Sequence, residues 1–117
     1  MNPLDYSLCD QIVTVYHKSG ETVTRKVIPN AYLSKKVSTP NEGYGKSKEK
    51  TFLLIIPEDF PIFPGDRIYA GIGPETVDWQ SFVPALVSEL YEAAFAKACC
   101  WMGEITHWEA GNRKEKL

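Results

Sequence analysis

The fold class of this chain depends on LYEAAFAKACCWMGEITHWEAG, residues 90–111. The alanines of residues 90–101 favour an α-helix by intrinsic propensity. Met102 and Gly103, however, have the composition of a tight turn, and the polar and apolar side chains of residues 104–108 alternate as in a half-buried strand. A hairpin with residues 90–101 as its first strand predicts an all-β protein, whereas a helix there predicts an α+β fold. We favour the hairpin.

The hairpin interpretation also fixes which side chains face each other. Counting outward from a two-residue turn pairs Trp101 with Glu104, Cys100 with Ile105, Cys99 with Thr106 and Ala98 with His107. Cys99 and His107 then lie at adjacent positions and not directly opposite. Glu92, Glu104 and Glu109 make the surroundings acidic, which disfavours a reactive thiolate. We therefore predict no nucleophilic cysteine.

The cysteines and histidines do not show a metal-binding pattern. The chain has three cysteines, an odd number, and Cys99 and Cys100 are sequence neighbours. We therefore expect reduced thiols that pack as small apolar groups. Only His17 and His107 are available as imidazole ligands, and no C-x-x-C or H-x-x-x-H spacing occurs. The sequence predicts no metal site, no cofactor and no catalytic residue, and hence a protein that is not an enzyme.

The preceding segments have strand and turn patterns. Residues 12–17 and 22–28 alternate around Ser19-Gly20, which predicts a hairpin. Pro29-Asn30 should end its second strand, and residues 31–33 could form a third short one. TFLLIIP, residues 51–57, is a continuous apolar run and predicts a strand buried on both faces.

Two further segments carry turn signals. In FPGDRIYAGIGPE, residues 63–75, Pro64-Gly65 predicts a turn before a short strand, and the glycines lack the helix start of a phosphate-binding loop. In DWQSFVPAL, residues 78–86, Asp78 has the position of an N-cap, and a single helical turn stopped by Pro84 is expected. Neither segment predicts a catalytic turn.

Together these patterns predict one domain over residues 1–117, a small β-barrel of five to seven strands with a short helical turn. Residues 37–50 should form a long flexible loop, and residues 112–117 a frayed tail. The first residues, MNPLDYSLCDQ, have no signal-peptide pattern, and no apolar run is long enough for a membrane span. The expected core consists of Val13, Val15, Leu53, Ile55, Ile68, Tyr69, Ile105 and Trp108.

The charges are unevenly distributed along the chain. Residues 35–50 contain five lysines against Glu42 and Glu49, a net charge of +3, whereas residues 58–109 carry nine acids against Arg67 and Lys97, a net charge of −7. Such a distribution favours oriented contacts with a partner, or it reflects a solvated loop. A second hypothesis is a small barrel that binds single-stranded nucleic acid or sugar. Its stacking platform would be drawn from Tyr69, Trp79, Phe82, Tyr91, Phe95, Trp101 and Trp108.

Four segments, taken in order, resemble a known family: LCDQIVTVYHKSGETVTRKVIPNAYL, FLLIIP, FPGDRIYAGIGPE and WMGEITHWEAG. The family consists of short proteins encoded in the head–tail gene clusters of Firmicutes phages and prophages, described as minor capsid or head–tail connector components. The resemblance covers residues 8–111. Its most specific parts are the PGDR-[IV]-Y-x-G-I-G-P block and W-x-G-E-x-x-H-x-E-A-G.

The resemblance implies a structural virion protein, a stopper-like connector that forms a homo-oligomeric ring beneath the portal. It would be located in the host cytoplasm during assembly and then in the virion. Its partners would be the portal or adaptor and a tail completion protein, with non-specific contact to packaged DNA through residues 37–50 as a second use of that loop. The expected partner or DNA contacts are Lys35, Lys36, Tyr44, Lys46, Lys48 and Lys50.

Overall fold

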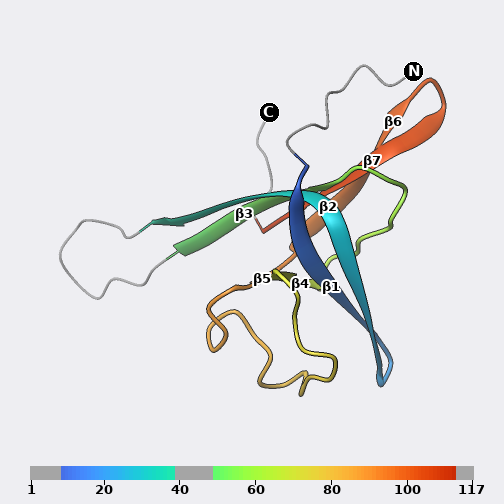
Figure 1. The fold of residues 1–117 in the computed structure, drawn as a ribbon. Helices are drawn as coiled ribbons and strands as arrows, with labels where there is room; N and C mark the ends of the chain where they lie inside the picture. The colour runs from blue at the N-terminus through green and yellow to red at the C-terminus, as the bar shows by residue number, and fades with distance from the viewer. Residues whose placement is uncertain (1–8, 39–48, 113–117) are drawn as a thin grey trace.

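A computed structural model describes residues 9–38 and 49–112 and shows a mainly β fold without a helix in those residues. The strands are β1 (Gln11–Ser19), β2 (Thr22–Ser38), β3 (Glu49–Ile56), β4 (Arg67–Ala70), β5 (Leu90–Glu92), β6 (Phe95–Trp101) and β7 (Glu104–Gly111). They form one antiparallel sheet of seven strands in the order β5-β4-β1-β2-β3-β7-β6, which curls into a half-barrel (Figure 1). The predicted small β-barrel is confirmed.

The two edge strands of the sheet, β5 and β6, follow each other directly in the chain. Ala93 and Ala94 join them, and the Ala93 amide donates to the Asp66 carbonyl while the Ala94 amide donates to the Gly111 carbonyl, both at 2.8 Å. The chain thus passes from one edge of the curled sheet to the other. The prediction of a single strand over residues 90–101 was wrong, because the segment supplies both edges.

The long strand β2 changes its partner half-way. Residues 22–31 pair with β1, and residues 32–38 pair with β3. The register shifts between Val13↔Ile28 and Gln11↔Ala31, so Pro29 and Asn30 form an exposed irregularity within the strand. Proline donates no ladder hydrogen bond and is tolerated at such a position. The prediction that Pro29-Asn30 ends the strand was therefore wrong.

Residues at both ends of the predicted loop, and the first residue of the predicted tail, belong to the ordered fold. Val37 pairs with Lys50 and Ser38 with Glu49, so the ends of the predicted loop 37–50 belong to β2 and β3. The rest of that loop, residues 39–48, lies outside the described residues. Of the predicted tail 112–117, Asn112 is held in place because its Oδ1 accepts a hydrogen bond from the Phe52 amide at 3.3 Å.

The main core is a cluster of buried side chains from strands on both halves of the sheet, and its composition differs in part from the predicted core. Phe52, Leu54 and Ile56 are buried whereas Leu53 and Ile55 are half-buried, so β3 has one core face and not two. Of the other residues predicted for the core, Val13, Val15 and Ile68 are buried, Tyr69 and Trp108 are half-buried, and Ile105 is exposed. Ile105 lies outside the core because it is next to the β6–β7 turn.

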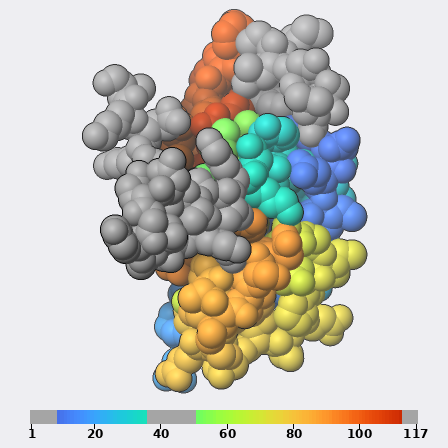
Figure 2. All heavy atoms as spheres, turned by 90° about the vertical axis from the view of Figure 1, so that its left-hand side faces the viewer, coloured from blue at the N-terminus to red at the C-terminus, as the bar shows by residue number. Residues whose placement is uncertain are grey.

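A second, smaller core cluster of Tyr16, Phe82 and Leu90 lies under residues 71–89. This connection, yellow to orange in Figure 2, covers one end of the molecule. The Ser81 and Phe82 amides both donate to the Asp78 carbonyl, and the Gln80 amide donates to Asp78 Oδ1. The predicted helical turn is thus an isolated hydrogen-bonded turn capped by Asp78, and the chain turns again through Pro84.

Candidate functional site

The β6–β7 hairpin turns at Met102 and Gly103, as the sequence predicts. Their φ angles are 54° and 83°, both in the left-handed region that a two-residue hairpin turn with a primed geometry requires. Next to the turn, Trp101 pairs with Glu104 and Cys100 with Ile105. The first two predicted pairs of the hairpin are therefore confirmed.

Beyond these pairs the register differs from the prediction. A β-bulge between Cys99 and Cys100 shifts the ladder by one residue, so Cys99 pairs with His107 and Ala98 with Trp108. Thr106 is the extra residue, and its Oγ1 donates to the Cys99 carbonyl at 3.1 Å. The prediction that Cys99 and His107 do not face each other was wrong, because a shift of one residue changes every later cross-strand pair.

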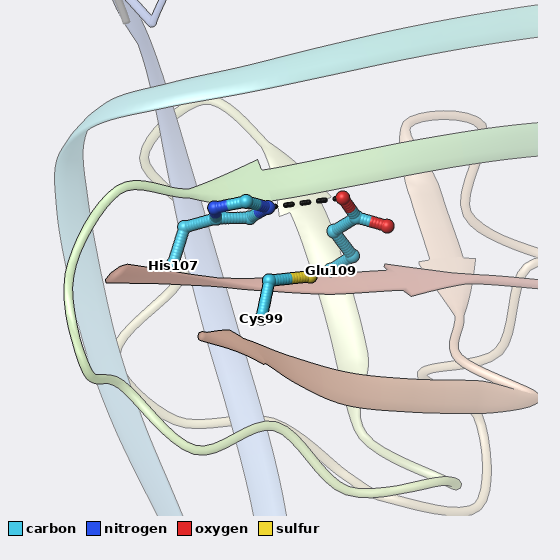
Figure 3. A group of neighbouring side chains, drawn as sticks. All are labelled: Cys99, His107 and Glu109. Atoms are coloured by element: carbon cyan, nitrogen blue, oxygen red, sulfur yellow. Dashed lines mark hydrogen bonds and ion pairs between the residues drawn. The ribbon is translucent and has the colours of Figure 1, made fainter. Parts of the chain in front are cut away.

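The bulge brings three chemically active side chains to one face of the hairpin. Cys99 faces His107 across the strands, and Glu109 follows two residues later on the same face of β7 (Figure 3). The His107 Nε2 and Glu109 Oε2 atoms are 2.9 Å apart. One sulfur, nitrogen or oxygen atom of each residue lies within 4.8 Å of the others. We name these three residues the hairpin cluster.

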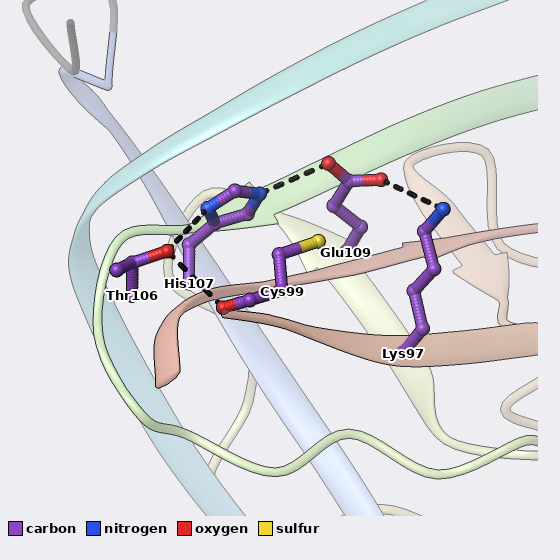
Figure 4. Close-up of polar contacts among 5 residues, drawn as sticks. All are labelled: Lys97, Cys99, Thr106, His107 and Glu109. Atoms are coloured by element: carbon purple, nitrogen blue, oxygen red, sulfur yellow. Dashed lines mark hydrogen bonds and ion pairs between the residues drawn. The ribbon is translucent and has the colours of Figure 1, made fainter. Parts of the chain in front are cut away.

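The charges around the hairpin cluster oppose a reactive thiolate. Burial raises the pKa of the Cys99 thiol, and the charge and hydrogen bond of Glu109 raise it further. Burial also acts to raise the pKa of Glu109. Hydrogen bonds with His107 and Cys99 and the charge of Lys97, whose Nζ lies 3.8 Å from Glu109 Oε1, outweigh burial and lower it (Figure 4). A thiol with a raised pKa is a weak nucleophile at neutral pH.

The three cysteines are free thiols, but they are not alike in burial. Cys9 and Cys99 are half-buried, whereas Cys100 is exposed. The prediction that Cys100 is a packing residue was therefore wrong. Because Cys99 and Cys100 are neighbours with different surroundings, they form a matched pair for experiments on the hairpin cluster.

A second histidine–carboxylate pair joins β1 to the segment FPGDR, residues 63–67. His17 Nδ1 is 2.6 Å from Asp66 Oδ1, and Asp66 Oδ2 accepts the Phe63 amide at 3.0 Å. Arg67 Nη1 donates to the carbonyls of Trp79 and Phe82, both at 2.6 Å. An open pocket of about 290 Å³ lies beside them. The polar groups of FPGDR thus hold the predicted turn and the short strand β4 in place.

Three of the basic residues predicted to contact partners or DNA lie at neighbouring positions of the paired strands β2 and β3. Lys35 is exposed, and its Nζ donates to Glu89 Oε1 at 3.0 Å. Lys36 and Lys50 lie on the paired strands β2 and β3, at the positions Lys36↔Thr51 and Val37↔Lys50. The other three predicted contacts lie outside the described residues: Tyr44, Lys46 and Lys48.

Exposed apolar side chains at the hairpin tip were not predicted. Trp101, Met102 and Ile105 are 42%, 81% and 37% exposed and lie within four residues of one another in the chain. We name them the hairpin tip. The other six aromatic residues of the proposed stacking set are buried or half-buried. Sequence reasoning placed Ile105 in the core because alternation alone does not show how far a hairpin projects beyond it.

Comparisons with family models, with curated proteins and with solved structures find no match to this chain. The resemblance to phage head–tail proteins therefore stays a prediction. Within the described residues, no helix has the length and apolar character that crossing a bilayer requires.

Proposed function

We propose that this chain is a non-enzymatic assembly protein of a phage head–tail junction and that copies of it associate through the β6–β7 hairpin. The observation that carries the proposal is the hairpin tip, where three large apolar side chains are exposed beside an edge strand of the sheet. Contiguous exposed apolar surface is a feature of contacts with other proteins, and these side chains supply the apolar groups for such a contact. The resemblance to head–tail proteins supports the place of that contact in a virion.

The backbone at Met102 adds a second argument. A side chain with a Cβ atom at a φ of 54° is strained by roughly 1–2 kcal/mol, and glycine or asparagine is the usual residue there. The Met102 side chain is 81% exposed, so contacts within the described residues do not offset this strain. Strained residues tend to occur at functional positions. A flexible apolar side chain at the tip of a hairpin is well suited to contact a partner.

The position of β6 at the edge of the sheet allows the hairpin contact to be repeated from one copy of the chain to the next. Among the strands described, β6 pairs with β7 alone. A hairpin that projects onto a different surface of the next copy makes a head-to-tail contact, and such contacts form a ring when the rotation between copies closes. The ring that the resemblance implies requires a contact of this type.

The proposal is tested by measuring the oligomeric state over a concentration series by sedimentation velocity. The double variant Trp101→Ser, Met102→Asn should shift the distribution towards monomer by at least one decade of concentration. Leu86→Ser is the matched control, because Leu86 is 71% exposed and lies away from the hairpin. Equal effects of the two variants, or a wild-type protein that stays monomeric at all concentrations, would contradict association through the hairpin.

The position in the virion requires a separate measurement. Gold-labelled antibody against this protein, applied to tailless heads and complete virions of the source phage, should label the head–tail junction in electron micrographs. Label distributed over the whole capsid, or its absence from virions, would contradict the proposed position. Self-association through the hairpin would remain separately testable.

A further inference from the structure

We infer that Cys99, His107 and Glu109 form a binding site for a thiophilic divalent cation, of which Zn²⁺ is the foremost example. This site is independent of the proposed assembly function, because it lies on the body of the hairpin and not at its tip. The argument rests on the types of ligand atom, their separations and the hydrogen bonds that orient them.

The ligand atoms are of the types that zinc prefers. Thiolate, imidazole and carboxylate are its usual ligands, at Zn–S distances of about 2.3 Å and Zn–N or Zn–O distances of about 2.0–2.2 Å. A tetrahedral ion at these bond lengths places its ligand atoms about 3.3–3.8 Å apart. The three atoms already lie within 4.8 Å of one another, so small side-chain rotations suffice. Sulfur and nitrogen ligands disfavour Mg²⁺ and Ca²⁺.

The hydrogen bonds of Thr106 orient the imidazole for a cation. The Thr106 hydroxyl gives its single proton to the Cys99 carbonyl. Its oxygen therefore accepts the Nδ1 proton of His107, at 3.3 Å. His107 Nε2 then faces Glu109 Oε2 at 2.9 Å, where a proton between the two atoms makes their hydrogen bond in the metal-free protein. A metal ion bound to both atoms displaces that proton to solvent, with Thr106 holding the ring from behind.

The β-bulge is what assembles the site. Without it, Cys99 would face Thr106, as simple counting from the turn predicts, and its sulfur would not lie opposite His107. The bulge interrupts the regular ladder of hydrogen bonds, and the alignment of three ligands gives this interruption a function. On binding, the Cys99 thiol releases its proton to solvent, and the thiolate forms the bond to the metal. Three protein ligands leave one coordination position for water or for a group of a partner.

Co²⁺ titration of the tag-free full-length chain tests the inference, because a cobalt–thiolate bond produces a charge-transfer band in the near ultraviolet. One equivalent of Co²⁺ should saturate the band, and Zn²⁺ should displace it. Cys99→Ser should abolish the band, whereas the matched control Cys100→Ser should retain it. Circular dichroism of both variants establishes that they are folded.

Thr106→Val tests the orienting role without removing a ligand. Its affinity for Co²⁺ should fall roughly 10- to 100-fold, as is usual for groups that orient metal ligands, while the spectrum of the saturated protein stays the same. A band that persists in Cys99→Ser, a band lost in folded Cys100→Ser, or no cobalt binding by the wild type would each overturn the inference. Retained binding in Trp101→Ser, Met102→Asn shows that metal binding and self-association are separate.

Discussion

Residues 9–38 and 49–112 contain two histidine–carboxylate pairs of similar length but opposite burial. In the His17–Asp66 pair the carboxylate side chain is 3% exposed and the imidazole 37%. In the His107–Glu109 pair the imidazole is 5% exposed and the carboxylate 25%. The buried partner is the one that the surrounding fold holds in place.

The difference shows what separates a structural pair from a candidate ligand pair. Both oxygens of Asp66 are used within the fold, one by His17 and the other by the Phe63 amide. Both oxygens of Glu109 also have partners, His107 and Lys97, but this carboxylate lies within reach of a third ligand atom, the Cys99 sulfur. The same two residue types therefore hold a turn in one place and, as we propose, bind a cation in the other.

The largest effect is expected from Asp66→Ala. This change removes the buried carboxylate that accepts the hydrogen bond of the Phe63 amide and pairs with the half-buried His17, and it should lower the free energy of unfolding by about 3 kcal/mol. Glu109→Gln, which keeps a hydrogen-bonding side chain beside His107, should cost less than about 1 kcal/mol. Urea denaturation measures both. Equal losses would remove the distinction between the two pairs.

Zinc should stabilise the protein only through the hairpin cluster. At a free Zn²⁺ concentration about 100 times the dissociation constant, binding to the native state alone adds about 2.7 kcal/mol to the free energy of unfolding. Thermal denaturation of wild type and Cys100→Ser should show this gain, and that of Cys99→Ser should not. A gain of the same size in all three proteins would place the zinc elsewhere.

Without metal, the stability of the wild type and that of Glu109→Gln should depend differently on pH. Its pKa is lowered in the folded protein from an ordinary value of 4.5, so its contribution to stability is present above that pH and is lost as the pH falls through the lower folded value. Between pH 7 and acid pH, the wild type should therefore lose more stability than Glu109→Gln. Parallel curves for the two proteins in urea denaturation would contradict the role of this carboxylate.

The smallest effect concerns the hairpin tip. Met102→Asn places a residue suited to left-handed φ at the turn and should raise the free energy of unfolding by roughly 0.5–1 kcal/mol. The same change removes an exposed apolar side chain and should weaken self-association. Denaturation at a concentration where the protein is monomeric measures the first effect. A loss of stability would show that Met102 packs within its own chain.

Much of the fold could be predicted from the sequence because its signals are local. Alternation and turn residues identified both hairpins, and Met102-Gly103 fixed the first two pairs of β6 and β7. No glycine or proline marks Ala93-Ala94, where the chain passes between the two edges of the sheet. Closure of a curled sheet is a tertiary property, so local patterns could not show that residues 90–101 form two strands.

The sequence patterns did not predict the hairpin cluster either, because its formation also depends on more than local signals. The bulge between Cys99 and Cys100 involves a hydrogen bond from Thr106 to a backbone carbonyl, which no spacing rule predicts. A shift of one residue moved Cys99 from Thr106 to His107 and created the cluster. The types of residue were visible in the sequence, but C-x-x-C and H-x-x-x-H patterns do not describe ligands that meet across two strands.

The central claim, that His107 and not His17 is a metal ligand, can be tested in one spectrum. The chain has two histidines, so a long-range ¹H–¹⁵N NMR spectrum of the labelled full-length protein contains two sets of imidazole signals. Cys99→Ser and Cys100→Ser samples serve to assign them and to test the thiol. One equivalent of Zn²⁺ should shift the Nε2 signal of His107 and leave His17 unchanged. Movement of the His17 signals alone, or no change in either set, would contradict the assignment of the site.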